Sequence, residues 1–397
     1  MALSLSKLLF VASCVAQVTV SGCATPQRLP AVPVAKFTQA EEALGPIRFR
    51  VTRETQSFAT EARSALAKEQ AWLASQDRTG PMPPANFLAV SGGGDNGAFG
   101  AGLLSGWTGA GTRPEFKAVT GISTGALIAP FAFLGPKYDY VLQKVYTATT
   151  PQDIFKKRGL LKGLFGDGLA DTRPLASIIQ SYVTPALLAE IAQEYGKGRL
   201  LLVGTTNLDT LEPVIWNMTA IAASKSPDAP SLFRSILLAS ASIPGAFPPV
   251  MIDVTIDGQH YEEMHVDGGT ASQVFFYPPS LSFAGAPTRQ RNLYLIRNAR
   301  MDAEWLSVER RTLSIATRAI ASLTRTQGVG DLYRIFTTTQ RDGIAFNLAF
   351  IPSSFNEPHR EEFDTIYMRA LFDRGREMAA GGYPWDKSPP GYEGAVL

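Results

Sequence analysis

A serine flanked by glycines at minus two and plus two constrains the fold of this chain more than any other feature. A short apolar run leads into Gly121-Ile122-Ser123-Thr124-Gly125, the nucleophile-elbow pattern in which a strand turns sharply into a helix. Glycine on both sides of the serine lets strand and helix approach without a Cβ clash. The pattern therefore predicts an exposed Ser123 hydroxyl at a helix N-terminus, where developing negative charge is favoured.

A glycine-rich loop follows an apolar strand upstream of the elbow. The backbone N–H groups of Gly92, Gly93 and Gly94 are not shielded by side chains, and such a loop at the start of a helix suits an anion or an oxyanion. Gly92, Gly94 and Gly97 also match the dinucleotide fingerprint, with Glu115 as the ribose-binding acid. We disfavour that alternative because Glu115 precedes the second strand, whereas the fingerprint places the acid at its end.

A third motif, Asp267-Gly268-Gly269, follows the strand-like residues 263–266. An aspartate just past a strand can point toward a neighbouring strand end. In isolation, an Asp-Gly pair is more often an ordinary turn. The Asp267 motif is informative because it follows the glycine loop and the elbow in the chain.

Together the three motifs resemble the patatin-like phospholipase family, whose members carry a glycine-rich oxyanion loop, a G-x-S-x-G nucleophile and a D-G-G or D-G-A aspartate in that order. The resemblance covers residues 87–298 and includes the proline-containing segment 238–249. It implies an α/β fold, a three-layer sandwich with a mostly parallel central sheet and helices on both faces. It also implies cleavage of lipid esters with no metal and no organic cofactor. The expected activity is of the phospholipase A or lipid esterase type. The family's loop usually has Arg or Lys where this chain has Asn96, and loss of that cation weakens the expectation of a phospholipid head group more than the expectation of ester hydrolysis.

The resemblance also implies residue roles: Ser123 as nucleophile, Asp267 as base, and the N–H groups of residues 92–94 as the oxyanion hole. One alternative is a Ser123–Asp267–His359 triad, because this is the chain order of α/β-hydrolases. Another is a catalytically silent lipoprotein that keeps the fold to bind lipid or a partner. Acyl transfer to an alcohol other than water also stays open, because the chemistry up to the acyl-enzyme is identical.

The rest of the chain predicts how these motifs are arranged. Apolar runs alternate with helical stretches from residue 87 onward, which is typical of a mostly parallel sheet covered on both faces. We expect helices at 304–325 and 361–378, an edge strand at 344–351, and a lid at 154–171, where apolar and basic residues mix. The predicted division of the chain is a signal peptide at 1–22, a tether and helical region at 23–84, a catalytic core at 85–300, and C-terminal elements that complete the core at 301–397.

The N-terminus indicates where the protein resides. Lys7 precedes an apolar run at 8–20, which is too short to span a bilayer and suits a secretory signal. The following Val20-Ser21-Gly22-Cys23 resembles the bacterial lipobox, with Cys23 as the lipidated first residue of the mature protein. The resemblance implies membrane tethering in the bacterial envelope, and Ala24 implies the outer membrane, facing the periplasm. A net charge of +2 and the lack of a basic run argue against a nucleic-acid partner.

Overall fold

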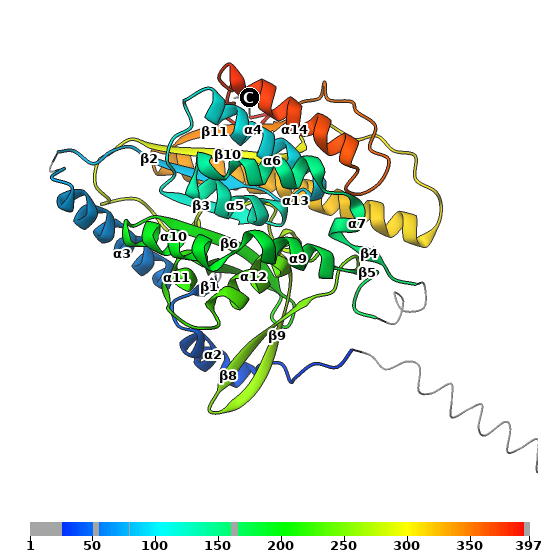
Figure 1. Cartoon of the computed structure of the whole chain (residues 1–397), viewed down its shortest axis with the longest axis horizontal. Helices are drawn as coiled ribbons and strands as arrows, with labels where there is room; N and C mark the ends of the chain where they lie inside the picture. Colours follow the sequence, from blue (N-terminus) through cyan, green and yellow to red (C-terminus); the bar gives the residue numbers. More distant parts are fainter. Residues whose placement is uncertain (1–25, 51–54, 79, 160–165, 393–397) are drawn as a thin grey trace, which may run out of the picture.

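The computed structural model describes residues 26–50, 55–78, 80–159 and 166–392, and within them nine strands form one sheet (Figure 1). These strands are β1 (Arg48–Arg50), β2 (Ala85–Val90), β3 (Ala118–Ile122), β6 (Leu200–Asn207), β7 (Glu212–Asn217), β8 (Val250–Ile256), β9 (Gln259–Asp267), β10 (Arg291–Arg300) and β11 (Ala345–Ile351). Two short strands, β4 (Lys156–Lys157) and β5 (Ala170–Asp171), pair separately. The predicted signal peptide and Cys23 lie outside the described residues.

The centre of the sheet is parallel. Its order is β1-β7-β6-β3-β2-β10-β11, and the neighbours from β6 to β11 pair in parallel. Strands β7 and β1 extend one side by antiparallel pairing, while β9 pairs antiparallel with the end of β6 and carries β8. Because the central strands share one direction, their carboxyl ends meet at one edge, where active sites of such sheets lie.

Helices cover both faces of the sheet (Figure 1). The described helices are α2 (Phe37–Leu44), α3 (Thr55–Ser75), α4 (Gly97–Gly109), α5 (Thr124–Leu134), α6 (Asp139–Ala148), α7 (Pro151–Ile154), α9 (Arg173–Tyr182), α10 (Pro185–Gly196), α11 (Met218–Ala223), α12 (Ala229–Ser240), α13 (Thr312–Arg341) and α14 (Thr365–Ala380). One core cluster joins α4, α5, α12 and α14 to one face, and two others place α13 and α3 on the opposite face. The expected three-layer α/β fold is confirmed.

The C-terminal elements share this core. Strand β11 is the edge strand beside β10, and Phe372 of α14 is buried in the same cluster as Phe99 of α4. The helix expected at 304–325 begins later and ends later, because α13 runs from Thr312 to Arg341. Its second half buries Leu332 and Phe336 against the sheet, so tertiary packing extends it through a glycine-containing stretch. The predicted division of the chain into domains stays a prediction.

Within the described residues, no single helix combines the length and apolar character needed to cross a membrane. Helices α9 and α10 pass that test only as a pair, with a bend of 61° between them.

Candidate active site

Ser123 occupies a strained turn between β3 and α5. Its φ and ψ are 55° and −126°, a combination that non-glycine residues rarely adopt. The flanking glycines allow the turn: a Cβ at Gly121 would overlap the Gly125 carbonyl, and a Cβ at Gly125 would overlap the Val90 carbonyl. The close approach expected from the elbow pattern is therefore present, and the Ser123 side chain lies at the start of α5. The expected exposure is wrong, because Ser123 is buried and lines a cavity instead of the outer surface.

Strand β6 brings Ser123 and Asp267 together. Ile122, the last residue of β3, pairs with Gly204 of β6, and the next residue of β6, Thr205, pairs with Asp267 of β9. Strands β3 and β9 thus follow one another along the same side of β6, and the elbow falls at their junction. Two residues far apart in sequence become neighbours because a parallel and an antiparallel strand share one edge of β6.

The Asp267 carboxyl group is buried, and it forms no ion pair with any residue in the described part of the chain. Burial raises the pKa of Asp267 to about 6, while hydrogen bonds from the Ser123 side chain and the Gly269 N–H act to lower it. The bond from Gly269 N–H to Oδ1 is 2.7 Å long and fixes the carboxylate. An aspartate with this proton affinity is still ionised at neutral pH and is a stronger base than an ordinary aspartate.

The glycine loop offers two free donors beside this pair. The N–H groups of Gly93 and Gly94 donate to no acceptor within the described residues, and Gly94 lines the same cavity as Ser123. Gly92 differs from the expectation, because its N–H donates to the Gln273 carbonyl at 3.0 Å. This bond ties the loop to the segment after Asp267 and removes Gly92 from the set of available oxyanion donors.

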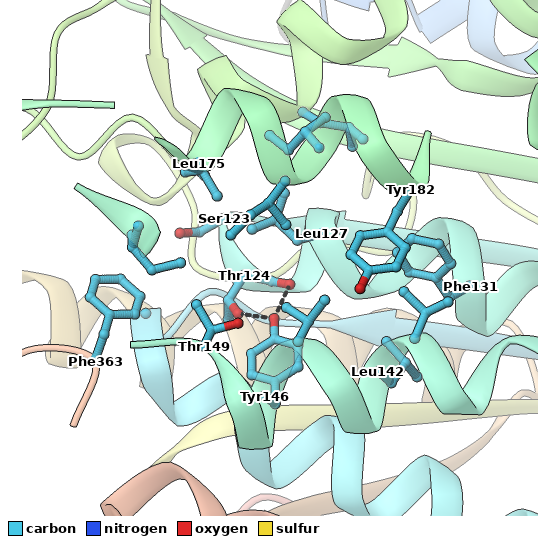
Figure 2. Close-up of a pocket in the computed structure, with 18 of the residues that line it drawn as sticks. Ser123, Thr124, Leu127, Phe131, Leu142, Tyr146, Thr149, Leu175, Tyr182 and Phe363 are labelled. Carbon is cyan, nitrogen blue, oxygen red and sulfur yellow. Dashed lines mark hydrogen bonds between the residues drawn. The ribbon is translucent and has the colours of Figure 1, made fainter. Parts of the chain in front are cut away.

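An apolar cavity of about 890 Å³, including its open mouth, begins at Ser123 (Figure 2). In this view Ser123 and Phe363 lie toward one side, and Phe131, Leu142 and Tyr182 lie toward the other. The wall comes from α5, α6, α9, α12 and the segment before α14. A deep apolar cavity with polar groups at one end suits a ligand that has one long hydrocarbon part and one polar part.

Comparison with known families identifies this region. The family model for patatin-like phospholipases matches residues 88–278. These residues are a patatin-like phospholipase domain. The match begins in β2, ahead of the glycine loop, and ends beyond Asp267.

Two solved structures are similar to this chain at low identity. VipD from Legionella pneumophila is 10% identical with a TM-score of 0.36, and the alignment covers 74% of this chain and 66% of VipD. The type III effector protein ExoU is 14% identical with a TM-score of 0.32, covering 76% of this chain and 53% of ExoU. The chain therefore spans about two thirds and about half of those two proteins. No curated protein matches it in sequence.

Ser240 holds the elbow of the patatin-like domain, and the sequence patterns did not identify it. The Ser123 N–H donates to Ser240 Oγ at 3.0 Å, and Ser240 Oγ donates to the Gly204 carbonyl at 2.7 Å. Ser240 ends α12 and is fully buried. Ser240 lies in the proline-containing segment 238–249, which supported the family resemblance. That resemblance was the only feature of the sequence that could have pointed to Ser240.

Asn298 holds the glycine loop in a similar way. Its side-chain amide donates to the Ser91 carbonyl at 2.9 Å, and its Oδ1 accepts from the Gly100 N–H at 3.1 Å. Its backbone carbonyl lies where a Cβ of Gly93 would stand, so only glycine fits there. No local sequence pattern marks Asn298, because its role depends on the parallel pairing of β10 with β2.

The segment before α14 contacts the other side of the loop. His359 Nε2 hydrogen-bonds Asp95 Oδ2 at 2.7 Å, and this bond, the largest cause, raises the pKa of His359. Tyr367 donates to Asn96 Oδ1 at 2.6 Å, so the position at which the family usually has a cation is occupied here by a neutral hydrogen bond. His359 is exposed and paired with Asp95, whereas a Ser123–Asp267–His359 triad requires it beside Asp267.

The other two histidines lie away from Ser123. His265 is buried between Thr205 Oγ1 at 2.9 Å and Glu263 Oε2 at 3.2 Å, and burial lowers its pKa. His260 is exposed beside Thr255. Neither contacts the Ser123 or Asp267 side chain through a hydrogen bond found in the described residues. Within those residues there is also no group of three or more His, Cys, Asp or Glu side chains arranged to hold a metal ion.

The segment expected to be a lid, 154–171, is described in part, since residues 160–165 lie outside the described structure. Ile154 lines the cavity, and the ring of Phe155 packs 5.8 Å from Phe247 and 6.1 Å from Phe363, measured between centroids. Lys156 and Lys157 are exposed. The segment therefore contributes to the wall near Ser123, and its action as a lid stays a prediction.

Proposed function

We propose that this protein is a serine acyl-hydrolase that cleaves lipid esters with Ser123 as nucleophile and Asp267 as general base. The observation that supports this most is the position of Ser123, which lies next to the buried Asp267 carboxylate and lines a large apolar cavity. A small polar substrate would leave the apolar wall of this cavity uncovered, whereas the acyl chain of a lipid would pack against it. The match to the patatin-like phospholipase family supports the same class of reaction.

The proposed reaction uses these groups in two steps. Asp267 accepts the hydroxyl proton while Ser123 Oγ attacks the ester carbonyl, and the N–H groups of Gly93 and Gly94 stabilise the resulting oxyanion. Asp267 then returns the proton to the leaving alcohol, which leaves an acyl-enzyme. A water molecule, deprotonated by the same carboxylate, hydrolyses this intermediate and restores Ser123.

We also propose that Cys23 carries a lipid anchor and that the protein is held at the outer membrane, facing the periplasm. The support is the lipobox-like Val20-Ser21-Gly22-Cys23 after an apolar run. Mass spectrometry of the protein isolated from membranes tests this, and an unmodified Cys23 or an uncleaved N-terminus contradicts it.

A fluorophosphonate probe tests the assignment of the site. We expect the probe to label the wild-type protein and His359→Ala, and to label neither Ser123→Ala nor Asp267→Asn. Loss of labelling in a folded His359→Ala protein would indicate a triad. An absence of wild-type labelling, together with no esterase activity on several acyl chain lengths, would indicate a catalytically silent lipoprotein.

A further inference from the structure

Five large exposed apolar side chains gather on one segment that the proposed reaction does not use. Trp305 is 88% exposed, and Leu323 is 71% exposed. Between and beside them, Leu306, Ile315 and Ile320 are also exposed. These five residues are called the α13 surface below. Single exposed apolar residues are common, but a group of large ones within a short segment marks an interaction site.

The α13 surface exists because α13 is longer than the sheet it covers. Its second half packs on the sheet through Leu332, Ile335 and Phe336. In its first part, residues 312–327, no side chain with a described exposure is buried. These sixteen residues span about 24 Å of helix. Figure 1 shows this end of α13 projecting from the body on the side of α7, β4 and β5.

The topology places this projection at the edge that holds Ser123. Helix α13 connects β10 to the parallel strand β11, so it begins at the carboxyl ends of the strands. Asn298, near the end of β10, contacts the loop at Gly93, and the α13 surface begins a few residues later. The cavity mouth and the α13 surface therefore lie at the same edge of the sheet.

The loop before the helix is fixed against it. Arg318 hydrogen-bonds the Glu304 carbonyl, and Arg325 donates to the Met301 carbonyl at 2.8 Å. The residue after Glu304 is Trp305, so the backbone that carries this exposed side chain is held beside the exposed part of α13. The apolar residues of loop and helix thus belong to one continuous segment with defined structure.

The charge of this segment favours one kind of partner. Residues 304–325 include four arginines and two glutamates, a net charge of +2, and one of these arginines, Arg311, pairs with Glu309 at 3.3 Å. A basic helix with exposed leucine, isoleucine and tryptophan is typical of segments that lie in the interface of an anionic bilayer. A two-fold contact with a second copy would bring the arginines of both copies together, which opposes association.

We infer that the α13 surface inserts into the interface of an anionic lipid bilayer and holds the cavity mouth of Ser123 against the membrane. The choice of a lipid partner rests on the proposed function, because a lipid substrate resides in such a bilayer. An interfacial site beside the mouth shortens the path of an acyl chain from the bilayer to Ser123.

The test uses fluorescence quenching in the full-length protein with Ser123→Ala, which prevents hydrolysis of the vesicle lipids. Vesicles of equal parts phosphatidylcholine and phosphatidylglycerol contain brominated acyl chains, which quench only tryptophans that enter the bilayer. The other four tryptophans, Trp72, Trp107, Trp216 and Trp385, are buried or half-buried. We expect quenching that disappears with Trp305→Phe. The readout is local to Trp305, so attachment through the N-terminus does not imitate it.

Two charged variants complete the test. Leu323→Asp should lower vesicle affinity about tenfold or more, because it replaces a buried leucine with a charge in the bound state. The matched control is Tyr140→Asp, which alters an exposed aromatic residue near Asp139. Asp139 is bonded to Arg113, which lies before β3 at the opposite edge of the sheet. Tyr140→Asp should leave vesicle affinity unchanged.

Three results would overturn the inference: no quenching of Trp305, equal effects of the two aspartate variants, or a dimer in solution that Leu323→Asp dissociates. Fluorophosphonate labelling of the protein with Ser123 intact separates this failure from a failure of the proposed function. A protein that is labelled at Ser123 but is not quenched is a hydrolase without this membrane contact.

Discussion

The Ser123 N–H donates a hydrogen bond of 3.0 Å to Ser240 Oγ, which connects the strained elbow to the end of α12. Ser240 Oγ in turn donates to the Gly204 carbonyl of β6. The positive φ of Ser123 is unfavourable by itself and persists only where the surroundings fix it. Ser240 therefore acts on the position of Ser123 without touching the reacting atoms.

Ser240→Ala should reduce both stability and activity. It leaves a buried N–H and a buried carbonyl without their partner, which costs about 1–3 kcal/mol of unfolding free energy. We expect kcat for a soluble ester to fall more than KM changes, because the elbow is misplaced while the cavity is intact. Ser242→Ala is the matched control: Ser242 Oγ bonds the Leu238 carbonyl one turn earlier in the chain. Equal losses of kcat in both variants would refute a specific role for Ser240.

The pH dependence of hydrolysis should follow Asp267. A base with a pKa of about 6 is protonated and inactive at lower pH, so kcat/KM should rise tenfold per pH unit up to about pH 6 and then level off. The measurement uses a short-chain soluble ester between pH 4.5 and 8. His359 also has a raised pKa, so the profile is repeated with His359→Ala. A profile that loses its acid limb in this variant would assign the limb to His359.

The raised pKa of Asp267 also predicts that the active site lowers stability. The folded protein binds this proton more tightly than the unfolded chain, so stability present below about pH 4 is lost as the pH rises through 6. A shift from 3.8 to about 6 corresponds to about 3 kcal/mol at most. Asp267→Asn should therefore be more stable than wild type at pH 8 and nearly equal to it at pH 4. Urea unfolding at both pH values measures the difference, and a wild-type protein that is the more stable one at pH 8 would contradict the argument.

The motifs around Ser123 were predictable because their geometry is local. The elbow needs glycines at fixed spacing, and Gly121 and Gly125 have the close backbone contacts that this spacing indicates. Ser240 and Asn298 were not predictable, since their partners depend on strand register and on where α12 ends. The same limit applies to Gly92, whose N–H is engaged by the Gln273 carbonyl from a distant part of the chain.

The boundaries of α13 show a second limit of sequence reasoning. Apolar and basic residues at 304–325 indicated a helix there, whereas the helix begins at Thr312 and continues to Arg341. The continuation contains Gly328 and Gly330, which disfavour a helix locally. Packing of Leu332 and Phe336 on the sheet outweighs that preference. Helix propensity and periodicity do not report such tertiary contacts.

The cavity should determine which acyl chains are accepted, and Leu127 tests this. Leu127 lies one turn after Ser123 on α5 and lines the cavity. A tryptophan at this position fills the space beside the nucleophile, so Leu127→Trp should still cleave acetyl esters while the rate for palmitoyl esters falls about tenfold or more. Leu127→Met keeps the volume and should retain the wild-type preference, whereas overpacking in the tryptophan variant costs about 1–3 kcal/mol of stability. Rates measured over a series of chain lengths, with thermal unfolding of each variant, separate the two effects. An unchanged palmitoyl-to-acetyl ratio in folded Leu127→Trp would mean that the acyl chain binds elsewhere.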